Sequence, residues 1–284
     1  MRAVFIPTGN AGKLREFMHV LSAQNRDCIG LNQAEKYLGS NFQWSTPKED
    51  RQTFAGNGYR KLSAALPFLS HLKIHGVSAV LVDDSGLCVP RLNYSPGVHS
   101  ATLSGEPRDD RRNREFLIKI LKNDLGLSDD QKEPAFFVCS LLMAKEIETG
   151  RLKQESVIVG EEQCLQHLEN LEPQIMEKTE KRVGRVSSTA YASRVYYSTA
   201  EGLYQLDLVM GFCTGFVATF EQELLPGEGH GYDAMFFPAA RPELSFASIP
   251  LEHKNTMSHR SEALRALSVW EKFRTVPSEI QELF

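Results

Sequence analysis

The sequence lacks the long apolar runs that mark membrane proteins. A membrane-spanning helix needs about 18 or more apolar residues in a row, whereas the longest run here, residues 135–144, spans ten positions and includes a serine. Before Pro7 there is one arginine and a four-residue apolar stretch, which is shorter than the apolar core of a secretory signal. We therefore expect neither a membrane partner nor a secretory leader.

Cysteine is scarce and widely spaced. The chain has five cysteines, an odd number, and the nearest pair, Cys139 and Cys164, lies 25 positions apart. This spacing provides no zinc-binding pair, no Cys-x-x-Cys redox motif and no disulfide framework. A reducing, cytoplasmic location is the expectation.

An excess of positive charge is also missing. The chain has 32 Lys and Arg against 36 Asp and Glu, a net charge of −4. A surface that binds nucleic-acid backbone is basic, so no nucleic-acid partner is expected, although a local basic pocket for a small anion is compatible with this balance. The 284 residues, 42% of them hydrophobic, suit one large globular domain or two modest ones.

Apolar periodicity predicts alternating strands and helices. Strands are expected at residues 3–6, 79–82, 135–144 and 206–220. Helices are expected at residues 12–21, 53–69, 113–125, 161–180 and 258–273, the last with Ser258 as its N-cap. This alternation indicates an α/β fold with a mixed sheet.

One polar stretch, from Gly150 to Gln205, interrupts this order. It is rich in Glu, Gln, Ser and Thr, and no linker rich in Pro and Gly marks a domain boundary. We predict a single domain over residues 1–284 with an insertion at about 150–205. The polar composition predicts that the insertion lies outside the core, so that a short linker in its place would leave a folded protein.

The first candidate for chemistry is the segment Thr8-Gly9-Asn10-Ala-Gly-Lys13, between a predicted strand and a predicted helix. Free backbone N–H groups at a helix N-terminus suit a phosphate, and Lys13 adds a full positive charge. The spacing is not that of a P-loop. A plain turn with a surface lysine is the alternative.

The second candidate is Asp83-Asp84-Ser85-Gly86, expected at the end of an apolar strand. Two adjacent carboxylates are costly to place together unless a cation or a basic group lies between them. Mg²⁺ accepts one or two carboxylates together with substrate phosphates. The alternative is a solvated acidic turn.

Two further candidates lie toward the end of the chain. In Gly229-His230-Gly231-Tyr232-Asp233 two rings could face a flat ligand, unless the segment is only a turn into the next strand. Lys254 and Ser258-His259-Arg260 place three basic groups at a helix N-terminus, against the helix dipole. They make sense if an anion lies in front of them, and a solvated helix start is the alternative.

Taken in this order, the segments resemble the inosine triphosphate pyrophosphatase family. Its pattern is T-G-N-x-x-K, then T-F-x-x-N with a later lysine, D-D-S-G-L, P-G-x-x-S-A, G-x-G-Y-D, and a lysine shortly before S-H-R. The chain supplies these motifs at residues 8–13, 53–61, 83–87, 96–101, 229–233 and 254–260. The match covers roughly residues 1–148 and 206–273.

The resemblance implies a two-lobed α/β fold with an elongated mixed sheet, a central cleft and a homodimer. It also implies Mg²⁺-dependent hydrolysis of deaminated purine nucleotides (ITP, dITP, XTP) to the monophosphate and pyrophosphate. Carried over by position, it assigns catalysis to Asp84, Lys13 and Lys61, and metal binding to Asp84, Asp83 and Glu49. It assigns substrate binding to Thr8, Gly9, Asn10, Lys13, Ser85, His230, Gly231, Tyr232, Asp233, Lys254, His259 and Arg260.

The chain departs from the family pattern at four positions. Gly56 replaces a glutamate, His230 a phenylalanine, Ala234 a proline and Thr102 an arginine. These changes leave two other functions open: a catalytically weak nucleotide-binding module, and a pyrophosphohydrolase with another base preference.

Overall fold

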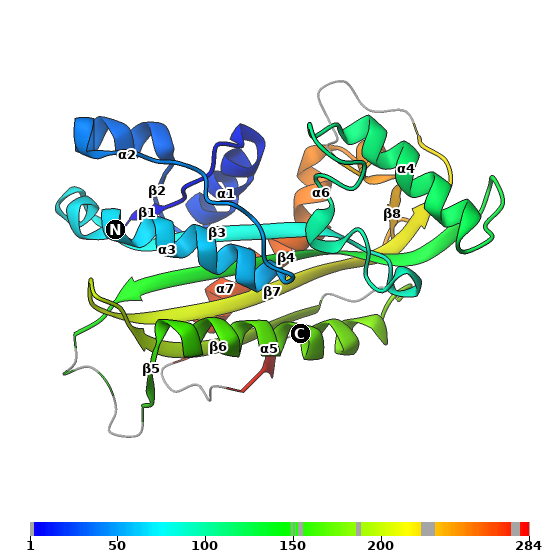
Figure 1. The fold of residues 1–284 in the computed structure, drawn as a ribbon. Coiled ribbons are helices and arrows are strands. Elements are labelled where there is room, and N and C mark those ends of the chain that lie inside the picture. Colours follow the sequence, from blue (N-terminus) through cyan, green and yellow to red (C-terminus); the bar gives the residue numbers. More distant parts are fainter. Residues whose placement is uncertain are drawn as a thin grey trace.

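The computed structural model describes residues 3–148, 150, 152, 156–185, 189–222, 231–273 and 279–283. Within these residues the chain forms one mixed sheet of nine strands, flanked by helices (Figure 1). The strands are β1 (Ala3–Phe5), β2 (Cys28–Ile29), β3 (Val77–Cys88), β4 (Lys132–Glu146), β5 (Ile158–Gly160), β6 (Thr189–Ser198), β7 (Leu203–Ala218), β8 (Phe236–Pro238) and β9 (Gln281–Glu282). The helices are α1 (Ala11–Ala23), α2 (Leu31–Leu38), α3 (Phe54–Leu72), α4 (Asp110–Asn123), α5 (Glu161–Glu180), α6 (Leu251–Met257) and α7 (His259–Trp270).

The strand order is β2-β1-β3-β4-β7-β6-β5, with β8 and β9 attached to β7 and β6. The β1–β2, β1–β3 and β5–β6 pairs are parallel and the other pairs are antiparallel. The predicted α/β class with a mixed sheet is therefore confirmed. No helix in the described part of the chain is both long and apolar enough to cross a membrane.

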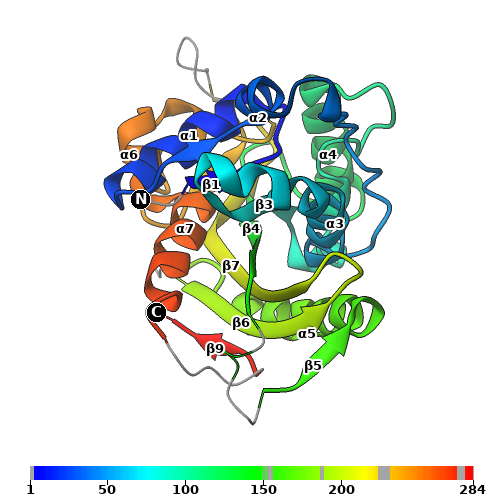
Figure 2. The same ribbon diagram turned by 90° about the vertical axis from the view of Figure 1, so that its left-hand side faces the viewer.

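Helices cover both faces of the sheet (Figure 2). One buried cluster joins α3 and α5 to the sheet, and a second joins α1 and α7 to the opposite face. A third cluster lies at the far ends of β3, β4 and β7, where α4 and β8 complete a second lobe. The two lobes are therefore built on three separate apolar clusters.

The strand that carries the acidic motif is longer than predicted. The sequence predicts a strand over residues 79–82 that ends at Asp83, whereas β3 continues to Cys88 because β4 pairs with it without interruption from Val80 to Cys88. Its parallel neighbour β1 stops opposite Val80. Between Leu81 and Leu87, β3 has a strand partner on one side only within the described residues, before Cys88 bridges to Pro96. The free edge borders a cavity with the segment that begins α1.

The prediction that the segment at 150–205 lies outside the core is wrong. Strand β6 pairs with β7 over ten residues, from Thr189 to Ser198. Helix α5 begins and ends where the sequence predicts and buries an apolar stripe made of Cys164, Leu168, Leu171 and Ile175. The polar composition reflects only the other face of the helix, whereas the 3.6-residue period of the stripe is what predicts burial.

This packing gives a stability prediction for α5. Leu168 is 1% exposed in the main core cluster, so Leu168→Ala should lower the free energy of unfolding by about 2–5 kcal/mol. The control is Glu162→Ala on the exposed face of the same helix, which should change it by less than about 0.5 kcal/mol. Urea denaturation followed by circular dichroism measures both, and equal stabilities would contradict the packing of α5 on the sheet.

Candidate active site

The sequence motifs meet at two adjoining cavities along the free edge of β3. One, of about 230 Å³, is lined by residues of the α1 turn, α3, β3, the segment after residue 230 and the start of α7. The other, of about 180 Å³, extends over residues 6–10. Both are bordered by Asn10, Lys13, Glu49, Lys61 and Arg108. Segments far apart in the sequence thus share one cleft.

The turn before α1 presents backbone N–H groups at a helix N-terminus. The Asn10 side chain caps the helix by accepting from the Lys13 N–H at 3.0 Å, and the Asn10 N–H donates to Thr8 Oγ1 at 3.2 Å. Gly9 has no other atom near the place of a Cβ, so the backbone here is open to a ligand. Such a turn binds phosphate oxygens through its N–H groups.

The two adjacent aspartates serve opposite faces of the sheet. Because side chains alternate along a strand, Asp83 points to the face of α1 and α7, where Lys13 Nζ lies 2.8 Å from its Oδ2. Asp84 points to the face of α3, where Lys61 Nζ lies 3.0 Å from its Oδ1. The two side chains thus do not lie on one face, because the acidic motif lies inside β3 and not at the end of a strand, where the sequence places it.

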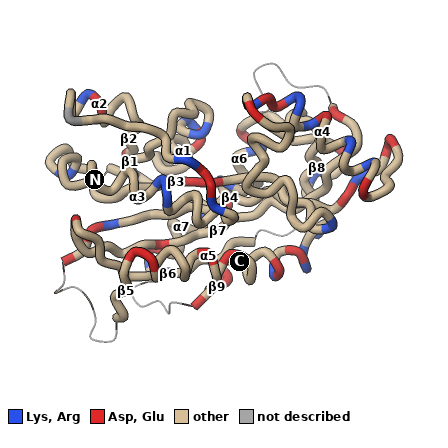
Figure 3. Tube along the Cα trace, in the orientation of Figure 1, with Lys and Arg blue, Asp and Glu red and all other residues tan. Residues whose placement is uncertain are grey.

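Lys61 is the cation on which the acidic groups of the α3 face converge. Its ammonium lies 2.9 Å from Glu49 Oε1 and donates to the Asp83 carbonyl at 3.1 Å, besides its bond to Asp84. Burial favours the neutral amine, but the carboxylates outweigh it, so the pKa of Lys61 is raised. Glu49 belongs to a short acidic stretch flanked by basic residues on the way from α2 to α3 (Figure 3).

The protonation of the two aspartates differs for physical reasons. Burial raises the pKa of Asp84, with Glu49 adding to the rise and Lys61 opposing it. Burial also acts on Asp83, but Lys13, Arg260 and Lys61 together hold its pKa below the usual range. Asp83 therefore stays ionised as a structural counter-ion, whereas Asp84 is the carboxyl group whose proton affinity is enhanced.

The donor set fits a hard cation that is shared with substrate. In the described part of the chain, no three His, Cys, Asp or Glu side chains are grouped to hold a metal ion by themselves. Asp84 and Glu49, however, converge on one positive charge, and Mg²⁺ in nucleotide enzymes takes one or two carboxylates while phosphates and water complete its shell. Asp84 and Glu49 are the residues that would hold it.

The basic residues near α7 are paired with acids. Arg260 donates to Glu16 of α1 and to Ser85 Oγ at 3.3 Å, and its Nε lies 3.7 Å from Asp83 Oδ2. Lys254 donates to Asp233 and so ties the loop before β8 to α6. The expected opposition to the helix dipole is relieved by these acids, which sequence spacing alone does not place there.

His259 is buried at the wall of the cleft and is held as a neutral ring. It stacks on Phe137 with 5.0 Å between centroids and 16° between planes. Burial, reinforced by Arg260 and Lys254, lowers its pKa well below the usual value. Among the described residues its Nδ1 is buried and has no hydrogen-bond partner.

The predicted aromatic segment is only partly described, because Gly229 and His230 lie outside the described residues. Tyr232 is 3% exposed, and its hydroxyl donates to the Ser100 carbonyl at 3.0 Å. Gly231 is fixed by α4, since its N–H donates to Asp110 at 2.9 Å and its carbonyl accepts from Arg114 at 2.8 Å. Tyr232 thus forms part of the cleft wall, with most of its ring in the core.

Two residues of this cleft lie outside the motifs that the sequence analysis identified. Glu16 follows Lys13 by three positions, so helical spacing could have placed it on the same face. Arg108 borders both cavities, but nothing in its sequence neighbourhood indicates that placement.

Known proteins match this chain over all the segments that build the site. A profile of the Ham1 family matches residues 4–164 and 160–270. A dITP/XTP pyrophosphatase of Clostridium perfringens is 28% identical over 267 residues, which cover 94% of this chain and 96% of the relative. A HAM1 protein from Coxiella burnetii shares the fold with a TM-score of 0.59 and 19% identity over 95% of this chain and 98% of its own.

These matches confirm the resemblance that the six motifs indicated. The profile covers the turn before α1, the aspartates of β3 and the basic start of α7, which are the parts that build the cleft. The chain belongs to the Ham1 family.

Proposed function

We propose that this protein is a Mg²⁺-dependent nucleoside triphosphate pyrophosphatase that converts ITP, dITP and XTP to the monophosphate and pyrophosphate. The observation that carries the proposal is the pairing of Lys61 with Asp84 and Glu49 in the same cavity that the turn before α1 lines. The names of relatives such as the Clostridium perfringens dITP/XTP pyrophosphatase support the same activity. The homodimer and the cytoplasmic location that the sequence predicts remain part of this proposal.

The triphosphate would lie along the turn at residues 8–13. The N–H groups at the start of α1, with Thr8, Gly9 and Asn10, would bind phosphate oxygens, and Lys13 and Lys61 would supply charge from either face of β3. A triphosphate carries about four negative charges that repel an attacking water. Neutralising them is therefore the first requirement of the reaction.

Asp84 would act as the proton acceptor. Mg²⁺ on Asp84 and Glu49, when bound, would polarise the phosphate and lower the pKa of a water molecule. Water oxygen bonds to the α-phosphorus, the bond from this phosphorus to the bridging oxygen breaks, and pyrophosphate leaves. The Asp84 carboxylate would take the proton of the water. Asp83 would not bind the metal but would hold Lys13 and Arg260.

The base would be read by Arg260 and His259. Arginine only donates hydrogen bonds and has five N–H groups, of which Glu16 and Ser85 use two. Its remaining donors favour a 6-keto oxygen over the 6-amino group of adenine. The neutral ring of His259 lines the same cavity beside Arg260 and would contact the base edge.

Asp84→Asn tests the proposed mechanism. The variant keeps the shape but removes the negative charge, so pyrophosphate release from ITP should fall ~10²-fold or more. The assay covers ITP, XTP, GTP and ATP with and without Mg²⁺, and Asp124→Asn on the exposed end of α4 is the matched control. Turnover by Asp84→Asn equal to that of the control would reject the mechanism. A wild-type protein that shows a thermal shift with nucleotide but releases no pyrophosphate would be a binding module.

Lys13→Met tests the phosphate site. Loss of a charged hydrogen bond to phosphate should raise KM for ITP about 10- to 100-fold, because such bonds contribute about 1.5–3 kcal/mol. Lys36→Met, on the exposed surface of α2, should leave KM unchanged. Steady-state kinetics of the three proteins decides the matter, and an unchanged KM in Lys13→Met would place the triphosphate elsewhere.

A further inference from the structure

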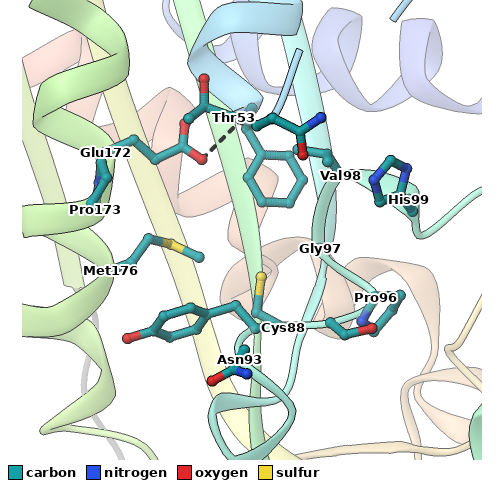
Figure 4. A pocket seen from close by; sticks show the side chains of 14 residues that line it. Thr53, Cys88, Asn93, Pro96, Gly97, Val98, His99, Glu172, Pro173 and Met176 are labelled. Carbon is teal, nitrogen blue, oxygen red and sulfur yellow. Dashed lines mark hydrogen bonds between the residues drawn. The ribbon is translucent and has the colours of Figure 1, made fainter. Parts of the chain in front are cut away.

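Helix α5, which comes from the segment that interrupts the family motifs, reaches the start of the helix that carries Lys61. Figure 4 shows Glu172 extending from α5 toward the beginning of α3. Its Oε1 accepts from the Phe54 N–H at 2.9 Å and its Oε2 from the Ala55 N–H at 2.7 Å. Thr53 accepts from the Gly56 N–H at 3.0 Å. The unpaired N–H groups of the first turn of α3 are therefore capped, two of them by a side chain from α5.

The first turns of α3 also position the candidate catalytic carboxylate. Asn57 Nδ2 donates to Asp84 Oδ2 at 3.3 Å, and Asn57 Oδ1 accepts from the Arg51 N–H at 2.9 Å. One turn later Lys61 donates to the other oxygen of Asp84 at 3.0 Å. A small shift of α3 against β3 would therefore change both hydrogen bonds to Asp84 at once.

Because Gly56 has no side chain, it leaves space at the start of α3 for the Glu169 side chain of α5. A Cβ at this position would lie 2.6 Å from Glu169 Oε1 and 2.7 Å from Thr53 Oγ1. Glu169 is held there by Arg51, with both contacts at 2.8 Å. The glutamate that the family pattern has at this position would require the Glu169 carboxylate and the Thr53 hydroxyl to move. In this chain carboxylates at the start of α3 come from α5 instead.

We propose that Glu172 is a positioning residue: its carboxylate holds the first turn of α3 so that Asn57 and Lys61 keep Asp84 in its reactive place. The segment at 150–205 then contributes to the active site through Glu172 of α5. This inference rests on the proposed function, because the positioned group is the proposed proton acceptor.

The two hydrogen bonds that Glu172 accepts from the start of α3 depend on the charge of its carboxylate. Burial raises its pKa to about 7, against the two N–H bonds, which lower it; Asp84 and Glu169 add to the rise. The titratable groups that line the same cavity are Cys88 of β3, and Tyr94 and His99 of the segment after β3. Arg51, before α3, pairs with Glu169. The carboxylate borders a cavity of about 340 Å³, through which protons can reach it.

A rise in pH through the pKa of Glu172 has opposite effects on activity and on folding stability. Above about pH 7 the ionised carboxylate accepts from both N–H groups, whereas below it one oxygen carries a proton and accepts poorly. The positioning effect is therefore lost as pH falls through 7. Since the folded-state pKa is raised, folding stability from this group instead falls as pH rises from the unfolded value toward 7.

Glu172→Gln is the test. At pH 8 its kcat for ITP should be about tenfold or more below wild type with KM within about twofold, because a displaced carboxylate slows chemistry more than binding. At pH 6, where the wild-type carboxyl is protonated, the two values of kcat should converge. Met176→Ala, a buried residue one turn further along α5, should lower stability but leave the pH profile of kcat as in wild type.

Amide hydrogen exchange at Phe54 and Ala55 provides a readout independent of turnover. Protection of both amides should be lower in Glu172→Gln than in wild type at pH 8. An unchanged kcat profile with unchanged protection overturns the inference while leaving the proposed function intact. If the wild type releases no pyrophosphate, the proposed function fails. Amide hydrogen exchange at Phe54 and Ala55 then decides alone whether Glu172 holds the first turn of α3. If Glu172→Gln does not fold, wild-type protection factors that stay constant from pH 6 to 8 overturn the inference.

Discussion

Two neighbouring carboxylates buried in the middle of one strand impose the constraint that organises this protein. Asp83 and Asp84 are each 6% exposed, and buried charges are tolerated only when they are paired. Because they point to opposite faces, each face needs its own cation. Lys13 and Arg260 serve one face and Lys61 serves the other. Helices α1, α3 and α7 carry these cations.

Motif order and apolar period predicted the class of fold, the position of most elements and the residues that meet in the cleft. What they did not predict depends on contacts between distant segments. The sequence around Asp83 looks like a turn, since Asp, Ser and Gly favour turns. Pairing with β4 from Val80 to Cys88 overrides that local preference. The partners of Arg260 depend in the same way on where α1 lies, which no local pattern specifies.

The segment at 150–205 shows how composition can mislead. Averaged over its length it is polar, yet Leu168 and Ile175 lie in the main core cluster together with Tyr191 and Tyr197 of β6. The spacing of the apolar residues carries information that the average composition of the segment removes. The departure at Gly56 also gains a physical explanation only in three dimensions, where the Glu169 carboxylate lies within 2.6 Å of the place of its missing Cβ.

The free edge of β3 has a consequence for behaviour in solution. A strand without a neighbour presents unpaired N–H and C=O groups, on which a strand of another molecule can add and start aggregation. Here the edge is kept short, and Lys61 donates to the Asp83 carbonyl while Arg260 donates to the Ser85 side chain. Lysine is a residue that proteins place on such edges for protection. The cations that line the cleft therefore also protect this edge against pairing with a strand of another molecule.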